Sequence, residues 1–114
     1  MGSPVVHFEV RSGDPDAARS FYGEMFGWSF APAGMPGYTY VDTGAEGSPP
    51  GGIGPTQAGT TLATFYVGVQ NVDAALQNAV RLGGKIVQPA TTVPGVTFGL
   101  FADPEGNVVG VASG

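Results

Sequence analysis

The stretch His7-Phe8-Glu9-Val10 returns 57 residues later as Thr64-Phe65-Tyr66-Val67, and this return decides the fold. Two further pairs of segments repeat at the same offset: Asp16-Ala17-Ala18 with Asp73-Ala74-Ala75, and Phe26-Gly27 with Gly83-Gly84. The offset is half of the 114-residue chain, so the repeat fills the protein. It predicts two copies of one supersecondary unit, each too small to bury its own apolar face, with a site formed between them.

The first copy has the pattern of a strand, a helix and three more strands. Residues 5–11 alternate as a strand does, with Phe8 and Val10 on its apolar face. Asp14 is placed to cap a helix that Gly27 ends in a left-handed conformation. The remaining strands are expected at residues 28–30, 37–42 and 52–54, with a Gly/Pro-rich loop over residues 44–50.

The second copy repeats this plan. Asn71 is placed to cap a helix that Gly83-Gly84 ends, and strands are expected at residues 61–69, 85–87, 96–101 and 108–112. The expected fold is α+β, with two βαβββ repeats in a single domain over residues 1–114. Its parts are module one over about residues 4–57, module two over about residues 58–114, and a polar connector over residues 55–60.

The composition excludes several classes of function. The chain has no cysteine, which rules out disulfides, thiolate zinc sites and a cysteine nucleophile, and which suits the cytoplasm. Its formal net charge of −5 disfavours nucleic acid or an anionic membrane as a partner. No apolar stretch reaches membrane-spanning length, and the first residues lack the pattern of a signal peptide. We expect a cytoplasmic protein whose partner is a small molecule.

Four segments, in the right order, resemble the vicinal oxygen chelate superfamily, which includes glyoxalase I, bleomycin-resistance proteins and extradiol dioxygenases. They are His7-Phe8-Glu9-Val10, Phe21-Tyr22 followed by Phe26-Gly27-Trp28, Val72-Asp73-Ala74-Ala75 leading to Leu82-Gly83-Gly84, and Asp103-Pro104-Glu105-Gly106-Asn107. The resemblance covers almost the whole chain. It implies a cup-shaped glyoxalase-like domain, in which the sheets of the two modules curl around a binding cavity and the helices lie outside.

The resemblance also implies a divalent metal held by two His and one or two Glu side chains on four strands. His7 is the only family ligand position that this sequence retains, because Thr64 stands at the second and Gly110 at the third. The fourth falls near Ile53. An open catalytic metal site uses about three protein ligands, so a metal is disfavoured and no cofactor is expected. A metal site formed by His7 together with Glu9 remains an alternative, because their side chains share a strand face and their backbones are about 7 Å apart.

His7 and Glu9 are the candidate catalytic residues. Imidazole changes charge near neutral pH and can be oriented by a carboxylate, so the pair suits acid/base chemistry or ligand binding. The alternative is a packed strand histidine that is hydrogen-bonded to Glu9, Tyr66 or a water. Burial of Glu9 is costly without a partner, so a buried Glu9 is expected to pair with His7, Arg11 or a tyrosine hydroxyl. A solvated Glu9 is the other alternative.

Aromatic walls with a few polar groups are typical of small-molecule cavities. The expected ligand-binding residues are His7, Glu9, Tyr38, Tyr40, Thr64, Tyr66 and Phe98. Packing in the core explains another set of aromatic residues better: Phe8, Phe21, Phe26 and Phe65.

Two functions remain open on the sequence. The first is metal-free binding of a small aromatic or apolar molecule, which the resemblance to the bleomycin-resistance branch implies. The second is a lyase, isomerase or dioxygenase-type enzyme that uses His7 and Glu9, with or without a metal. A homodimer is also expected, because superfamily members often dimerise and small paired sheets expose apolar faces.

Overall fold

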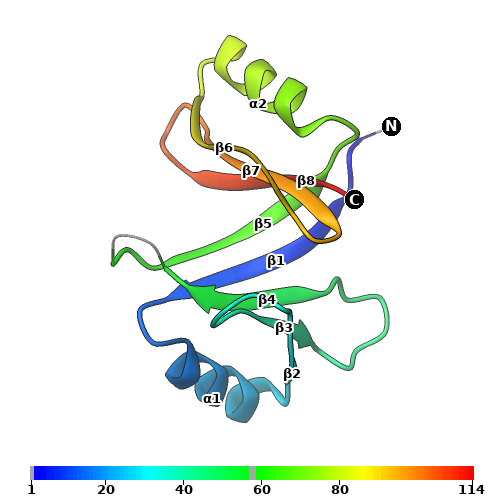
Figure 1. Cartoon of the computed structure of the whole chain (residues 1–114), viewed down its shortest axis with the longest axis vertical. Coiled ribbons are helices and arrows are strands. Elements are labelled where there is room, and N and C mark those ends of the chain that lie inside the picture. Colours follow the sequence, from blue (N-terminus) through cyan, green and yellow to red (C-terminus); the bar gives the residue numbers. More distant parts are fainter. Residues whose placement is uncertain (1, 57–58) are drawn as a thin grey trace. The chain divides into compact units, whose positions relative to one another are not determined.

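The structure is a computed structural model that describes residues 2–56 and 59–114. Its elements, in chain order, are β1 (Val5–Ser12), α1 (Pro15–Phe26), β2 (Ser29–Pro32), β3 (Thr39–Asp42), β4 (Gly51–Pro55), β5 (Leu62–Gly68), α2 (Val72–Arg81), β6 (Lys85–Val93), β7 (Val96–Ala102) and β8 (Val108–Ser113) (Figure 1). Each half runs strand, helix and three strands, as the repeat predicts. Within the expected connector, Gln57 and Ala58 lie outside the described residues.

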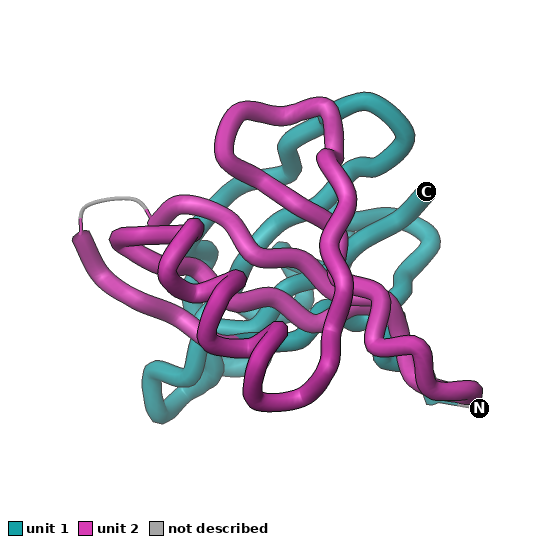
Figure 2. Tube along the Cα trace, turned by 90° about the horizontal axis from the view of Figure 1, so that it is seen from below, with its two compact units in different colours: residues 1–6, 64–114 teal, residues 7–63 magenta. Residues whose placement is uncertain are grey.

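The contacts within the chain divide it into two compact units. The N-terminal unit is His7–Ala63, and the C-terminal unit is Thr64–Gly114 joined by the start of the chain up to Val6 (Figure 2, magenta and teal). The chain start belongs to the C-terminal unit because the backbone N–H of Gly68 donates to the carbonyl of Pro4 at 2.8 Å. The strands are ordered β2-β3-β4-β1 in the first unit and β5-β8-β7-β6 in the second.

Both helices begin and end where the sequence predicts. The Asp14 carboxylate accepts the backbone N–H of Ala17 at 3.1 Å, and Gly27 closes α1 with a φ of 73°. The Asn71 side chain accepts the N–H of Ala74 at 2.9 Å, so α2 has the same type of cap. These caps satisfy amides that have no partner inside the helix. They therefore fix the residue at which each strand gives way to its helix.

The C-terminal unit has a compact apolar core under α2. Val72, Leu76 and Val111 are its buried members, and Ile86 and Phe101 pack against them. In the N-terminal unit the buried residues belong to the sheet, above all Ile53 with no exposed surface and Val41. Strand β4 is glycine-rich because the Phe8 ring lies against Gly51, where a Cβ would fall under 3.0 Å from the ring.

Core packing is the wrong explanation for three of the phenylalanines. Phe21 is 60% exposed, Phe26 is 53% exposed and Phe65 is 43% exposed. Helix α1 has no buried residue, because its aromatic side chains pack mainly on one another and on Trp28 at the surface. Helical spacing predicts which residues share a face of the helix, but it does not show how deeply that face is covered.

Strand β6 is longer than expected: it runs to Val93, pairs with β7 and lies at one end of the strand order of its unit. The pairing shifts register between Ile86 and Gln88, just before Pro89, and again between Gln88 and Thr91, the interval that contains Pro89. Proline cannot donate a backbone hydrogen bond, which accounts for an irregular ladder at this point. Among the described residues, no helix is long and apolar enough to cross a membrane.

Candidate functional site

The alternation of β1 places three polar side chains on one face of the N-terminal unit. His7, Glu9 and Arg11 follow one another at every second residue, while Phe8 lies on the opposite face against the Trp28 ring. Glu9 is 5% exposed and is the buried charged residue of the described chain. A carboxylate taken out of water needs partners that compensate its charge, so the surroundings of Glu9 decide what this face can do.

The Glu9 carboxylate has two of its partners in the same unit. Arg11 donates from Nε to Oε2 of Glu9 at 2.7 Å, an ion pair whose side chains are 16% and 6% exposed. The Tyr38 hydroxyl donates to Oε1 at 2.9 Å. Each oxygen therefore has a donor from a different segment, which holds the carboxylate in place. The sequence prediction that a buried Glu9 has a charged or phenolic partner is confirmed.

The hydrogen bonds determine which nitrogen of His7 carries a proton. Nε2 of His7 lies 3.1 Å from the Tyr38 hydroxyl, and the one hydroxyl proton is already donated to Glu9. Nε2 is consequently the donor, and neutral His7 has its lone pair on Nδ1. Burial lowers the pKa of His7, and the negative charge of Glu9 opposes this effect without cancelling it. His7 is thus held as an oriented, neutral imidazole near neutral pH.

The Tyr38 ring is held between this polar network and the glycines of β4. A Cβ at Gly52 or Gly54 would fall under 3.0 Å from atoms of the ring. Tyr40 stands edge-on to Tyr38 with ring centroids 6.1 Å apart and is 45% exposed. The fixed phenol and the exposed ring together present an aromatic edge beside His7.

The corresponding residues of the C-terminal unit are Tyr66 in place of the carboxylate and Thr64 in place of the imidazole. Tyr66, the counterpart of Glu9 in the repeat, is 4% exposed, and its ring lies on Gly110 so closely that a Cβ there would fall under 3.0 Å from it. Phe98 stands edge-on to Tyr66 with ring centroids 6.3 Å apart. The Thr64 hydroxyl, at the His7 position of the repeat, donates to the Val108 carbonyl at 2.7 Å.

The strand registers narrow the fourth metal-ligand position, expected near Ile53, to the neighbouring Gly52. Gly52 is paired with Glu9, as Gly110 is paired with Tyr66, whereas Ile53 lies on the opposite, fully buried face. Both last-strand positions are therefore glycines covered by a tyrosine ring. Within residues 2–56 and 59–114, no group of three His, Cys, Asp or Glu side chains can hold a metal ion. The residues do not fit the divalent metal of the resembled superfamily, because Thr64 and two glycines replace three of its ligands.

The structure brings the expected residues together in two sets. His7, Glu9, Tyr38 and Tyr40 form one set in the N-terminal unit, while Tyr66 and Phe98 form the other in the C-terminal unit. The sequence predicts Arg11 as a partner for Glu9 but not as a member of the site. Its signal was available in the alternation of histidine, carboxylate and guanidinium on one strand face.

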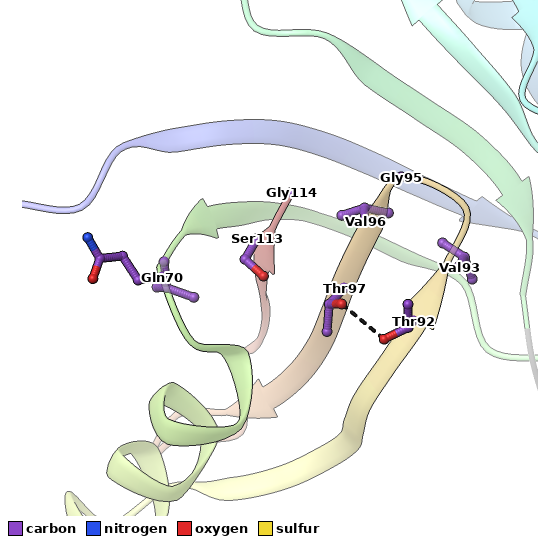
Figure 3. Close-up of a pocket in the computed structure, with 9 residues that line it drawn as sticks. Gln70, Thr92, Val93, Gly95, Val96, Thr97, Ser113 and Gly114 are labelled. Carbon is purple, nitrogen blue, oxygen red and sulfur yellow. Dashed lines mark hydrogen bonds between the residues drawn. The ribbon is translucent and has the colours of Figure 1, made fainter.

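A separate pocket of about 610 Å³ lies in the C-terminal unit (Figure 3). Its lining combines the β6–β7 hairpin, the end of β8 and the segment before α2: Val69, Gln70, Thr92, Val93, Gly95, Val96, Thr97, Ser113 and Gly114. None of the residues expected in the site lines it.

Residues 5–111 match the family model of the Glyoxalase/Bleomycin resistance protein/Dioxygenase superfamily. Curated relatives from Mycobacterium bovis and Mycobacterium tuberculosis, both named "Putative glyoxylase CFP32", are 27% identical over 111 residues. The match takes in 90% of this chain and 42% of each relative, so the chain spans less than half the length of these relatives.

Solved structures share the fold at low sequence identity. A superfamily member from Vibrio splendidus has a TM-score of 0.65 and 12% identity, and the match covers 99% of this chain and all of that one. A Streptomyces coelicolor methylmalonyl-CoA epimerase variant in complex with 2-nitronate-propionyl-CoA has a TM-score of 0.62 and 17% identity, with 99% and 95% covered. At these identities the likeness extends to the fold alone.

Proposed function

Because the chain belongs to the Glyoxalase/Bleomycin resistance protein/Dioxygenase superfamily, we propose that it is a member that binds a small molecule without a divalent metal. The observation that carries the proposal is the tyrosine ring over each last-strand glycine, Tyr38 on Gly52 and Tyr66 on Gly110. These rings occupy the space into which a side chain at either position would project. A metal cage is thereby replaced by two aromatic surfaces.

The ligand contacts in this proposal come from the N-terminal unit first. His7 and Tyr38 supply polar atoms whose hydrogen-bond directions are fixed by Glu9, and Tyr40 supplies an exposed ring. Small-molecule sites combine apolar walls with a few oriented polar groups, which is the chemistry of this set. Within the C-terminal unit taken by itself, we keep Thr64, Tyr66 and Phe98 as proposed ligand-binding residues, and we expect the ligand to be a small, largely aromatic or apolar molecule with one polar group.

Metal dependence is tested on untagged protein. Elemental analysis after purification, followed by calorimetric titration with Zn²⁺, Mn²⁺ and Ni²⁺, is expected to give less than one tenth of an equivalent of bound metal and no saturable heat. Stoichiometric metal with micromolar or tighter affinity would overturn the proposal. The same result in His7→Ala protein would place that metal elsewhere in the chain.

Ligand binding is tested by a thermal-shift screen of aromatic acids, phenols and neutral aromatics. A ligand that raises Tm in the wild type is expected to lose at least tenfold in affinity on Glu9→Gln, because that change replaces a carboxylate that accepts from both Tyr38 and Arg11 by a neutral amide with a single acceptor oxygen. Glu24→Gln, at an exposed position of α1, is the matched control and is expected to keep full affinity. Equal affinities in the wild type and both variants would contradict the proposed site.

A second candidate is metal-free proton transfer at His7. The ordered bonds from His7 through Tyr38 to Glu9, together with a lowered pKa, favour a neutral, oriented base. An isomerase or lyase reaction on an acidic C–H bond is the corresponding chemistry. Deuterium exchange into a bound candidate, lost in His7→Ala while binding persists, would support this enzyme; exchange that is absent from the wild type would remove it.

The proposal includes assembly as a homodimer in the cytoplasm. The exposed apolar side chains of α1, among them Phe21, Met25 and Phe26, support an association of this kind. Light scattering across a tenfold dilution is expected to give the mass of two chains, and a single-chain mass at the highest concentration would contradict the dimer.

A further inference from the structure

The Tyr38 ring lies lengthwise on bare backbone of β4. A Cβ at Gly52 would meet the hydroxyl end of the ring, and a Cβ at Gly54 would meet its Cγ end. Both glycines are buried, and the absence of a side chain is what lets a ring approach the strand so closely. We call the space over Gly52 and Gly54 the ring slot.

The polar end of the ring slot recognises a hydroxyl group. Glu9 is paired with Gly52, and its Oε1 accepts the proton of the Tyr38 hydroxyl at 2.9 Å. Nε2 of His7 donates to the same oxygen at 3.1 Å. A single oxygen that both donates and accepts matches these two side chains. The slot and its polar end together fit a phenol: a flat ring that carries a hydroxyl.

The phenol that fills the slot comes from a turn. Residues 33–37 join β2 to β3, and Tyr38 follows them directly, before the first residue of β3. The turn is closed by two backbone bonds, from the N–H of Tyr38 to the Met35 carbonyl at 3.2 Å and from the N–H of Ala33 to the Tyr38 carbonyl at 3.3 Å. Both are longer than the usual N–H···O distance of about 2.9–3.0 Å. Few strong backbone bonds therefore hold the ring in its slot.

Glycines on this turn allow it to move. Gly37, next to Tyr38, has a φ of 75°, and Gly34 has a φ of 80°. Glycine adopts conformations on both sides of φ = 0 at little cost, so either residue can act as a hinge. Nη1 of Arg19 donates to the Gly37 carbonyl at 3.4 Å, and the same guanidinium is paired with Asp16. Arg19 thus keeps a charged partner when the turn moves.

The C-terminal unit shows the fixed form of the same cover. Its ring comes from Tyr66, which is a residue of β5 and is paired with Gly110 in the ladder. Removal of that ring would break the pairing of two central strands. Removal of the Tyr38 ring breaks no pair in the β3–β4 ladder, which begins at Thr39.

We propose that the ring slot binds a phenol, and that Tyr38 is its internal occupant, which the ligand displaces when the turn of residues 33–37 opens. The inference rests on the metal-free function proposed above and names its ligand class. The incoming hydroxyl takes over both bonds, to Glu9 and from His7. A neutral phenol is required, because a phenolate has no proton for Glu9 and adds a second negative charge beside it.

The first test is an NMR titration of ¹⁵N-labelled wild-type protein with p-cresol, which is the tyrosine side chain as a free molecule. Saturable shifts are expected at the amides of Gly52, Gly54 and Tyr38. Toluene lacks the hydroxyl, and 4-methylanisole accepts a hydrogen bond but cannot donate one. Both are expected to bind at least tenfold more weakly than p-cresol.

The second test empties the slot. Tyr38→Ala is expected to bind p-cresol at least tenfold more tightly than the wild type, because no internal ring has to leave. Phe21→Ala, which removes an exposed ring of α1, is the matched control and should bind p-cresol as the wild type does. Calorimetric titration measures all three affinities.

Saturable binding to Tyr38→Ala without any to the wild type would make the ring a permanent part of the fold and overturn the proposal. Absence of wild-type shifts at Gly52 and Gly54 would also overturn it, so the first test decides even if Tyr38→Ala fails to fold. Equal binding of toluene would do the same. Shifts confined to the amides of Tyr40 or Phe98 would reject the ring slot and leave the proposed metal-free binding function intact.

Discussion

In each unit a tyrosine ring covers a glycine of the last strand, but the ring comes from a different segment in the two units. In both, the last strand carries a glycine opposite the central residue of the first strand, Gly52 opposite Glu9 and Gly110 opposite Tyr66, and a tyrosine ring covers that glycine. In the C-terminal unit the ring comes from the first strand itself. In the N-terminal unit it comes from Tyr38, just before β3.

This difference in the origin of the ring explains why one unit carries a carboxylate at this position and the other does not. In the C-terminal unit the Tyr66 ring covers Gly110 from the first strand and stands edge-on to Phe98. Where Tyr38 supplies the ring, the first strand is free to carry Glu9, and the phenol oxygen becomes a link between that carboxylate and His7. A repeat thus preserves the shape of a face while one copy gains titratable groups.

The largest expected effect breaks the polar face. Arg11→Met leaves the Glu9 carboxylate buried without its guanidinium, and loss of one partner of a buried pair costs about 3 kcal/mol. The loss in free energy of unfolding is measured by urea denaturation of the wild type, Arg11→Met and the double variant Arg11→Met/Glu9→Leu. The double variant is expected to recover at least half of the loss, because no uncompensated charge remains. A double variant less stable than Arg11→Met would show that the pair contributes net stability.

The next effect tests the apolar face. Gly110→Ala places a methyl group in the Tyr66 ring, and overpacking of this kind costs about 2 kcal/mol. Gly13→Ala is the control, since that glycine has open space around it, and its stability is expected to change by less than about 0.5 kcal/mol. Combining Gly110→Ala with Tyr66→Ala should be less damaging than the sum of the single changes. Additive losses would mean that ring and glycine are not a matched pair.

A smaller effect isolates the link that only the N-terminal unit has. Tyr38→Phe keeps the ring over Gly52 and removes the hydroxyl that joins His7 to Glu9, at a cost of about 1 kcal/mol. Tyr40→Phe, at the exposed neighbouring ring, should change stability by a few tenths of a kcal/mol or less. Calorimetry gives the Tm of both variants. Equal decreases in Tm would contradict a stabilising role for the Tyr38 hydroxyl between His7 and Glu9.

The smallest effect is a dependence on pH. The pKa of His7 is lowered in the folded protein, so between that value and the ordinary one of about 6.5 the unfolded chain binds more protons than the folded chain. The contribution of His7 to the free energy of unfolding is therefore expected to be complete above a pH of about 7 and to be lost as the pH falls through this window. His7→Gln should flatten the difference in Tm between pH 7.5 and 5.5. An unchanged slope would assign the dependence to other groups.

Much of the fold follows from local sequence rules. Asp14, Asn71 and Gly27 specify the helix ends by satisfying free amides or adopting a left-handed φ, and both effects depend on near neighbours only. The superfamily was also evident from sequence, because its segments are spaced along one chain. Local rules do not reveal the depth of burial, and for this reason Phe21 and Phe26 were wrongly assigned to the core.

The sequence predicted which residues form the candidate site but not the hydrogen bonds that join them. Alternation along β1 shows that His7 and Glu9 share a face, yet the bond that joins them runs through Tyr38, which is 31 residues from His7. Such a contact depends on the register of β3 and β4, and sequence patterns leave this register uncertain by a residue or two. The fourth ligand position could be placed only near Ile53 for the same reason, since a shift of one residue reverses the face on which a side chain lies.

The broken register of β6 has a consequence for the behaviour of the protein at high concentration. An outer strand with unpaired backbone groups is a template on which another chain can add a strand and aggregate. Pro89 and the two shifts around it interrupt that template in the middle of a nine-residue strand. At the outer strand of the other unit, β2 is four residues long and ends at Pro32. Strands β2 and β6 thus each carry protection against uncontrolled sheet growth.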